Sequence, residues 1–307
     1  ETDNYSTVPS SLKKVCVSGS YPIPDEAFDS CRFIEEVILS TEIRQIGANA
    51  FASCVSLAVI SFGENSALQT IGVGAFTGCY DLVAVVIPSG VYQLGEAAFM
   101  NCRELKTVVF EANDLLQTIE RMTFAGCSGL TGIAIPASVT QLGVSAFSGC
   151  SVLESINIPQ GVTKLLDNVF AGCGFRTLTF GADCAITEIG EFAFMGCSRL
   201  ESVRVSEGSK VRSFGKNAFS ECDLLNTVEL PEGLITLGES VFSHCRALKS
   251  VSFGKESALE SLGMSAFYDC ISLTEIHIPE KITEISRRTF YGCSALVSVE
   301  FSENLTK

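Results

Sequence analysis

Cysteine is the residue type that could carry chemistry in this 307-residue chain, which has 14 cysteines but only two histidines, His244 and His277. Twelve of the cysteines follow a phenylalanine by three residues, as Cys31 follows Phe28. Regularly spaced thiols can ligate metals, form disulfides or pack in a core. The distances between the thiols distinguish these roles.

Metal ligation and disulfide bonding both fit the spacing poorly. Zinc sites use cysteine pairs at short spacing such as Cys-x-x-Cys, and the sequence contains no such pair. A disulfide needs Cβ atoms about 3.8 Å apart, whereas equivalent atoms in stacked strands lie about 4.8 Å apart. We therefore predict no metal site and a buried ladder of free thiols that pack as small hydrophobic side chains. Cys16 and Cys184 lie outside this ladder, and we expect them to be more exposed.

The two histidines form no recognisable catalytic constellation. His244 lies in a Phe-Ser-His-Cys turn and His277 in a predicted strand, so we expect them on different faces. A Ser-His-carboxylate triad needs its members within hydrogen-bond reach, and the sequence has no Gly-x-Ser-x-Gly motif. The segment from Gly72 to Gly78 is one residue too long for a dinucleotide-binding fingerprint. We predict a protein without enzymatic activity, with no catalytic residue and no cofactor.

The elements that position these residues are repeats, because the Phe-x-x-Cys pattern recurs every 23 to 25 residues. In a well-formed unit, Val85 and Ile87 show the two-residue period of a strand. Ala75, Phe76 and Cys79 of the same unit show helical spacing, which predicts a single helical or 3₁₀ turn.

Stacking of these units determines the domain organisation. A unit this short cannot bury its own apolar face, whereas stacked copies can. The regular spacing of the repeats leaves no room for a linker between two domains. We predict that residues 12–307 form a single solenoid domain of about twelve full repeats and a partial first coil, preceded by an N-terminal extension over residues 1–11.

Composition excludes two classes of partner. The chain is 47% hydrophobic, and its 21 Lys and Arg against 35 Asp and Glu give a formal net charge of −14. This field repels phosphate backbones, so nucleic acid is not expected as a partner. The longest uninterrupted apolar run is Leu82 to Ile87, far short of the roughly 20 residues of a membrane helix, so we expect no membrane insertion in this segment.

The repeated unit Ile-Gly-x-x-Ala-Phe-x-x-Cys-x-x-Leu-x-x-Val-x-Ile-Pro resembles the BspA-type leucine-rich repeats of bacterial and protozoan surface proteins, over about residues 12–301. The resemblance implies a leucine-rich-repeat solenoid, a curved right-handed superhelix of 23–25-residue coils. It places a parallel β-sheet on the concave face and short helical turns and loops on the convex face. It also implies a secreted or cell-surface location and a protein partner, such as host extracellular matrix or a cell surface.

The outward positions of the predicted sheet change character along the chain. Side chains alternate along a strand, so residues such as Ala84 and Val86 point away from the core. These positions are apolar in the N-terminal half and polar in the C-terminal half, and no Lys or Arg lies between Arg44 and Arg103. Exposed apolar patches often mark contact sites. The predicted ligand-binding residues are Ile38, Val59, Ala84, Val86, Val109 and Ala134.

Several interpretations of this surface stay open. β-Branched residues suit strands in general, and a neighbouring segment could cover the strip. We predict an adhesin-like repeat protein that recognises a protein partner through its concave face. The alternatives are a structural or self-associating envelope spacer, and a glycan-binding module or enzyme that uses the polar C-terminal half.

Overall fold

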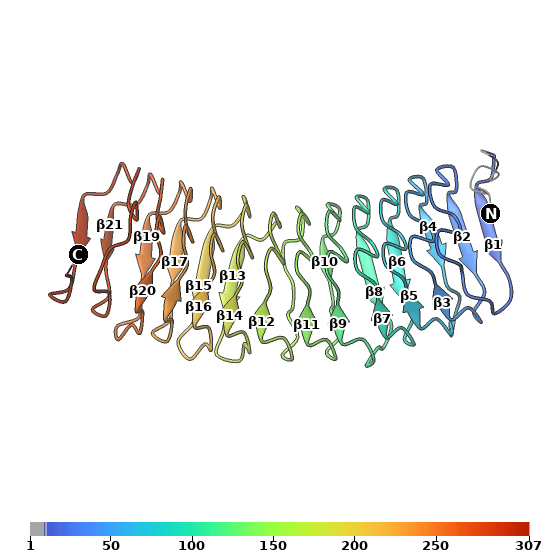
Figure 1. The fold of residues 1–307 in the computed structure, drawn as a ribbon, viewed down its shortest axis with the longest axis horizontal. Coiled ribbons are helices and arrows are strands. Elements are labelled where there is room, and N and C mark those ends of the chain that lie inside the picture. Colours follow the sequence, from blue (N-terminus) through green and yellow to red (C-terminus); the bar gives the residue numbers. More distant parts are fainter. Residues whose placement is uncertain (1–8, 10, 307) are drawn as a thin grey trace. The chain divides into compact units, whose positions relative to one another are not determined.

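The computed structural model describes residue 9 and residues 11–306, so most of the expected extension over residues 1–11 lies outside the described residues. The chain forms short parallel strands joined by turns and loops (Figure 1). It divides into two compact units, Glu1–Gly161 and Val162–Lys307, and each unit is a β-solenoid. The single-domain organisation, the curvature and the right-handed sense of the coil stay predictions.

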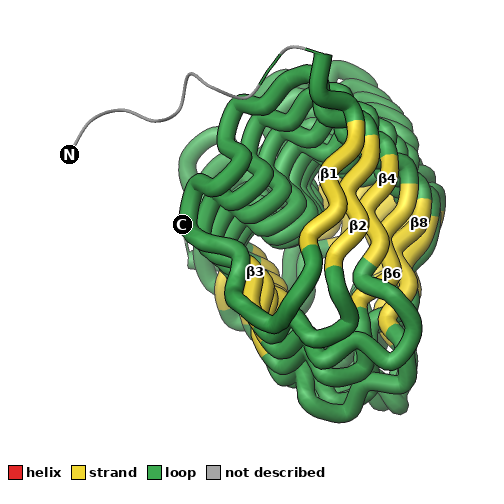
Figure 2. The backbone as a smooth tube through the Cα atoms, turned by 90° about the vertical axis from the view of Figure 1, so that its right-hand side faces the viewer, coloured by secondary structure: helices red, strands yellow, loops and turns green. Residues whose placement is uncertain are grey.

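The main sheet of the first unit has six parallel strands in the order β1-β2-β4-β6-β8-β10. Each coil contributes one strand, and equivalent residues of successive coils pair in register, as Val85 pairs with Val108. Figure 2 shows the first strands of this sheet side by side along one side of the coils. β1 lies in the segment predicted as a partial first coil. The strands are β1 (Lys14–Val17), β2 (Glu36–Leu39), β4 (Val59–Ser61), β6 (Ala84–Ile87), β8 (Thr107–Phe110) and β10 (Gly132–Ile133).

A second row of two-residue strands lies elsewhere on the same coils, where β3 is labelled in Figure 2. These strands form the sheets β3-β5-β7 and β11-β9. Their inward residues, such as Ile46 and Ile71, are completely buried. The strands are β3 (Gln45–Ile46), β5 (Thr70–Ile71), β7 (Gln93–Leu94), β9 (Thr118–Ile119) and β11 (Gln141–Leu142).

The second unit repeats this arrangement. Its main strands form a four-stranded sheet, β13-β15-β17-β19, and a separate two-stranded sheet, β21-β22. The short strands form one five-stranded sheet, β12-β14-β16-β18-β20. The main strands are β13 (Thr177–Phe180), β15 (Ser202–Val205), β17 (Thr227–Glu229), β19 (Ser250–Ser252), β21 (Glu275–His277) and β22 (Ser298–Glu300). The short strands are β12 (Lys164–Leu165), β14 (Glu188–Ile189), β16 (Ser213–Phe214), β18 (Thr236–Leu237) and β20 (Ser261–Leu262).

Stacked phenylalanines run through the core of each unit. The rings of Phe51 and Phe76 lie 5.4 Å apart and within 1° of parallel, and those of Phe242 and Phe267 lie 5.7 Å apart at 11°. All four side chains are fully buried. In the second unit Phe175 is buried as well, and its ring meets that of Phe170 edge-on at 82°.

The Ala-Phe-x-x-Cys segments are successions of β-turns in place of the expected helical turn, and the described residues contain no helix. The N–H of Ala75 bonds to the carbonyl of Gly72, and the N–H of Cys79 bonds to that of Phe76. The third residue of each of these turns, Gly74 or Gly78, has a positive φ, as in a type II turn. These residues therefore leave the right-handed region that a helix requires.

Candidate functional site

The six residues predicted as a binding strip all lie on the solvent side of the six-stranded sheet. Val59, Val86 and Val109 are 51%, 46% and 45% exposed, and Ala84 and Ala134 are also exposed. Ile38 is half-buried. The alternate residues of the same strands, such as Val85 and Ile87, are completely or almost completely buried, as expected from the period of a strand.

Strand pairing brings these side chains together. Val59 pairs directly with Ala84, and Val86 pairs directly with Val109. Ile38 pairs with Ser61 and lies diagonal to Val59. At the other end, Ala134 follows β10 and bridges to Asn157, which ends the apolar run. We call these six residues the apolar strip.

The first unit, which carries the apolar strip, is acidic overall. Residues 1–161 contain seven Lys and Arg against 16 Asp and Glu, a formal net charge of −9. At the N-terminal end of the sheet, Lys14 pairs with Glu36 at 2.8 Å, with both side chains well exposed. Such exposed pairs stabilise a fold little, but an acidic unit favours partners with basic surfaces.

The thiol ladder is confirmed as free and buried. All 14 cysteines are free, and those of the ladder are buried except Cys31, which is half-buried. Cys16 is exposed and Cys184 half-buried, as predicted. The thiols do more than pack: the Sγ of Cys79 donates a hydrogen bond to the carbonyl oxygen of Phe51, one coil earlier, at 3.2 Å. The same bond is made by Cys54, Cys102, Cys127, Cys150, Cys197, Cys222, Cys245, Cys270 and Cys293.

Burial also controls the reactivity of these thiols. Burial raises the pKa of Cys54 to about 12 and raises the pKa of Cys102 and Cys222 well above the ordinary value of 9.0. A thiol, and not a thiolate, is therefore present at neutral pH, and nucleophilic or metal-binding chemistry is suppressed. Within residue 9 and residues 11–306, no group of three or more metal-binding side chains gathers.

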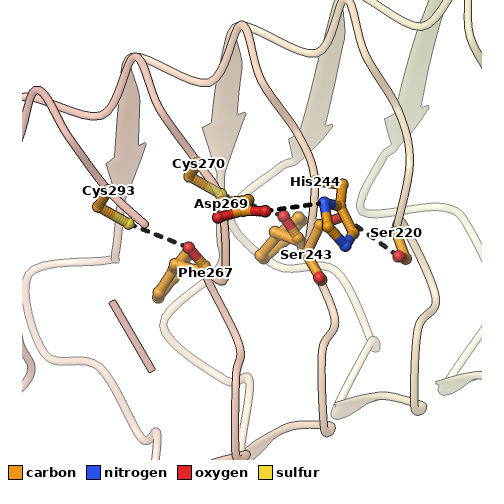
Figure 3. A network of polar contacts seen from close by, with 8 residues as sticks. Ser220, Ser243, His244, Phe267, Asp269, Cys270 and Cys293 are labelled. Atoms are coloured by element: carbon orange, nitrogen blue, oxygen red, sulfur yellow. Dashed lines mark hydrogen bonds and ion pairs between the residues drawn. The ribbon is translucent and has the colours of Figure 1, made fainter. Parts of the chain in front are cut away.

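The histidines lie in different parts of the coil, as expected. His277 is on β21, where its Nδ1 lies 3.3 Å from a carboxylate oxygen of Glu300. His244 is in a turn, and its Nδ1 lies 3.4 Å from Asp269 Oδ2 (Figure 3). The nearby Ser220 hydroxyl donates to the carbonyl oxygen of Ser243 rather than to His244. The Ser, His and carboxylate residues of Figure 3 are thus not linked as a catalytic triad.

The outward row of the second unit is polar, in agreement with the sequence. Arg204 on β15 makes two contacts with Glu229 on β17, from Nε at 2.7 Å and from a terminal nitrogen at 2.8 Å. Thr177, Ser202 and Thr227 align across the same sheet. Sequence reasoning missed a set of hollows beside this row, centred on the half-buried Phe253.

Comparison with known proteins shows the family to which the chain belongs. Residues 21–154, 117–227 and 187–307 match the BspA type leucine rich repeat region, with six copies. The chain belongs to this family. A search of curated proteins found no match. No described segment forms a helix that could cross a membrane.

Solved structures of bacterial leucine-rich repeat proteins share the fold. A leucine-rich repeat protein from Bacteroides ovatus is 27% identical, with a TM-score of 0.79 over 96% of this chain and 82% of that one. The pneumococcal vaccine antigen PcpA is 18% identical, with a TM-score of 0.68 over 97% and 77%. A leucine rich cell surface protein from Faecalibacterium prausnitzii is 24% identical, with a TM-score of 0.53 over 94% and 87%.

Proposed function

We propose that this BspA-type protein is a non-enzymatic, secreted or cell-surface binding protein that recognises a protein partner through the apolar strip. The observation that carries the proposal is the exposure of Val59, Val86 and Val109 on neighbouring strands. Equivalent outward positions in the second unit hold Thr179, Arg204 and other polar residues. Strand propensity alone would favour β-branched apolar residues equally along the array, so the local bias supports a contact surface.

The exposed valines and the net charge of the first unit indicate the chemistry of the partner. An apolar centre within a unit of net charge −9 favours a partner surface with an apolar patch and basic side chains around it. Such a complex gains affinity from the apolar contact, and its association rate falls as salt is added. A protein of host extracellular matrix or a host cell surface fits this description.

The proposed cell-surface location is taken from the descriptions of similar proteins. The Faecalibacterium protein is described as a cell surface protein, and PcpA as a vaccine antigen. Their likeness to this chain establishes the shared fold, and we extend the surface location to this chain as part of the proposal.

A paired substitution tests the strip. Val86→Asp with Val109→Asp places two carboxylates side by side at its centre, and both side chains point to solvent, so the fold should survive. Binding to a panel of purified extracellular-matrix proteins, measured by surface plasmon resonance, should be abolished. The matched control is Thr177→Asp with Thr179→Asp, which alters two outward positions of β13 in the second unit.

Two outcomes would contradict the proposal. Unchanged binding by the Val86/Val109 variant would remove the strip as the site. Absence of binding by the unmodified protein to every member of the panel would remove a matrix partner. Circular dichroism of both variants shows whether the fold is retained.

Self-association is the second candidate, because the same exposed valines could meet a second copy of the chain. Light scattering over a concentration series separates the two functions. A mass that stays monomeric at all concentrations excludes self-association. A mass that rises with concentration in the unmodified protein, but stays monomeric in the Val86/Val109 variant, supports it.

A further inference from the structure

A break in the main sheet of the second unit marks a site distinct from the apolar strip. β17 and β19 pair in register, as Thr227 pairs with Ser250, and β21 pairs with β22. β19 and β21 are neighbours, but no ladder pairing joins them, although the structure describes every residue of both strands. The side of each strand that faces the other is therefore left without its usual main-chain partners.

A hollow lies at this break. Its volume is about 420 Å³, and its walls are the residues of β19 and β21 with Phe253, Ser298 and Glu300. Two adjoining hollows of about 590 Å³ each also include Phe253 in their walls. These volumes fall within the range of small-ligand sites, roughly 300–1,000 Å³. We call the central one the β19–β21 hollow.

Hydrogen-bonding groups of both kinds line the β19–β21 hollow. Its acceptors are the carboxylates of Glu275 and Glu300, and the hydroxyls of Ser250, Ser252 and Ser298 both donate and accept. His277 also lines the hollow, and its Nδ1 lies 3.3 Å from a carboxylate oxygen of Glu300. The half-buried ring of Phe253 adds an apolar surface where the three hollows meet. A ligand that fits must offer many hydroxyl-type donors and acceptors together with an apolar face.

Charge narrows the class of ligand. Glu275 and Glu300, with His277 beside Glu300, give the hollow a negative character that disfavours a sulfated or otherwise polyanionic chain. In the adjoining hollow, Lys255 and Lys281 are matched by Glu256 and Glu280, so that surface is balanced and does not select a strongly cationic peptide. An uncharged, hydroxyl-rich molecule satisfies both surfaces.

We propose that the β19–β21 hollow binds a short neutral oligosaccharide. The carboxylates of Glu275 and Glu300 accept hydrogen bonds from sugar hydroxyls, and the serine hydroxyls complete the polar contacts. The ring of Phe253 packs against the C–H face of a sugar ring, as apolar surfaces do in small-molecule sites. The adjoining hollows give room for a chain of more than one sugar. This site lies in the second unit and does not depend on the function proposed for the apolar strip.

Saturation-transfer NMR with neutral oligosaccharides of hexose and N-acetylhexosamine tests the site in the full chain. We expect signal transfer to at least one oligosaccharide and a dissociation constant raised about tenfold or more by Glu275→Gln with Glu300→Gln, because charge-assisted hydrogen bonds are lost. Ser250→Ala with Ser252→Ala provides a second variant with little risk to the fold, since both side chains are exposed. It should weaken binding to a smaller extent.

The control is the Val86→Asp with Val109→Asp variant, which should retain oligosaccharide binding even though it lacks the strip. Absence of transfer to every oligosaccharide overturns the proposal. Unchanged affinity in both hollow variants overturns the location. Loss of oligosaccharide binding in the strip variant alone also overturns the location. Oligosaccharide binding by NMR tests the hollow, whereas protein binding by surface plasmon resonance tests the strip, so the two proposals can fail separately.

Discussion

The Sγ of Cys102 donates a hydrogen bond to the carbonyl oxygen of Phe76, which lies 26 residues earlier, at 3.2 Å. The same oxygen accepts the N–H of Cys79 within its own coil, also at 3.2 Å. Each ladder phenylalanine that makes both bonds thus joins the turn of one coil to the thiol of the next. Both lone pairs of this carbonyl oxygen therefore accept a hydrogen bond, one from the turn N–H and one from the thiol of the next coil.

Removal of this thiol should destabilise the protein. Cys102→Ala leaves one lone pair of the Phe76 oxygen unused and opens a small void, and we expect the free energy of unfolding to fall by about 1–3 kcal/mol. Cys102→Ser keeps a hydrogen-bond donor, so its free energy of unfolding should fall by less. Urea denaturation followed by circular dichroism measures both, with Cys184→Ala outside the ladder as the control. Equal losses for Cys102→Ala and Cys184→Ala would show that the bond contributes nothing.

Alkaline pH should unfold the protein through the same thiols. Burial raises the pKa of Cys54 from 9.0 to about 12, so the folded state keeps a proton that the unfolded chain releases. This stabilisation is fully present below pH 9 and is lost between pH 9 and about 12, at up to ~1.4 kcal/mol per pH unit for each such thiol. Thermal unfolding at increasing pH should show a falling midpoint across this window. A midpoint that is constant from pH 9 to 11 would contradict it.

Thiol reagents should separate the ladder from the other cysteines. At pH 8 in native conditions, an aromatic disulfide reagent should modify the exposed Cys16 rapidly and the half-buried Cys184 more slowly. The buried ladder thiols should react only after denaturation. Peptide mapping by mass spectrometry identifies the modified residues, and rapid native labelling of Cys102 or Cys127 would show that the ladder opens.

A glycine pair tests the closeness of the coils. A Cβ on Gly72 would lie 2.6 Å from the main-chain nitrogen of Ala48 and the carbonyl carbon of Gly47, so Gly72→Ala must push two coils apart. We expect a loss of about 1–3 kcal/mol or more. Gly132→Ala is the matched control, because nothing lies within 4 Å of its added Cβ. Equal unfolding midpoints for the two variants would contradict the close approach.

The sequence was sufficient to predict the array but not its finer contacts. The Phe-x-x-Cys spacing predicts the stack of Phe51 on Phe76 and the burial of the thiols, because only in-register coils place equivalent residues together. The turns were misjudged, since positions such as Asn49 and Met122 have positive φ without being glycine. Helical spacing of apolar residues does not distinguish a helix from successive turns over so few residues.

The exposed surfaces, too, could be predicted from the sequence only in part. Alternation along the strands correctly places Val86 and Val109 on the solvent side. The β19–β21 hollow could not be predicted, because the loss of pairing between two particular strands depends on how neighbouring coils diverge and not on the type of residue. Phe253 resembles the other apolar residues that follow a strand, and only the coordinates reveal its place among three hollows.

The stacked interior also bears on how such proteins change over generations. Because the contact between one coil and the next is made by the same few buried groups at each level, a whole coil can be gained or lost by recombination without redesign of its neighbours. The solvent-facing row adds only exposed contacts between coils, such as that of Arg204 with Glu229, so its residues can change without altering the core. The length of the array and the chemistry of its outer surface can therefore diversify independently of each other.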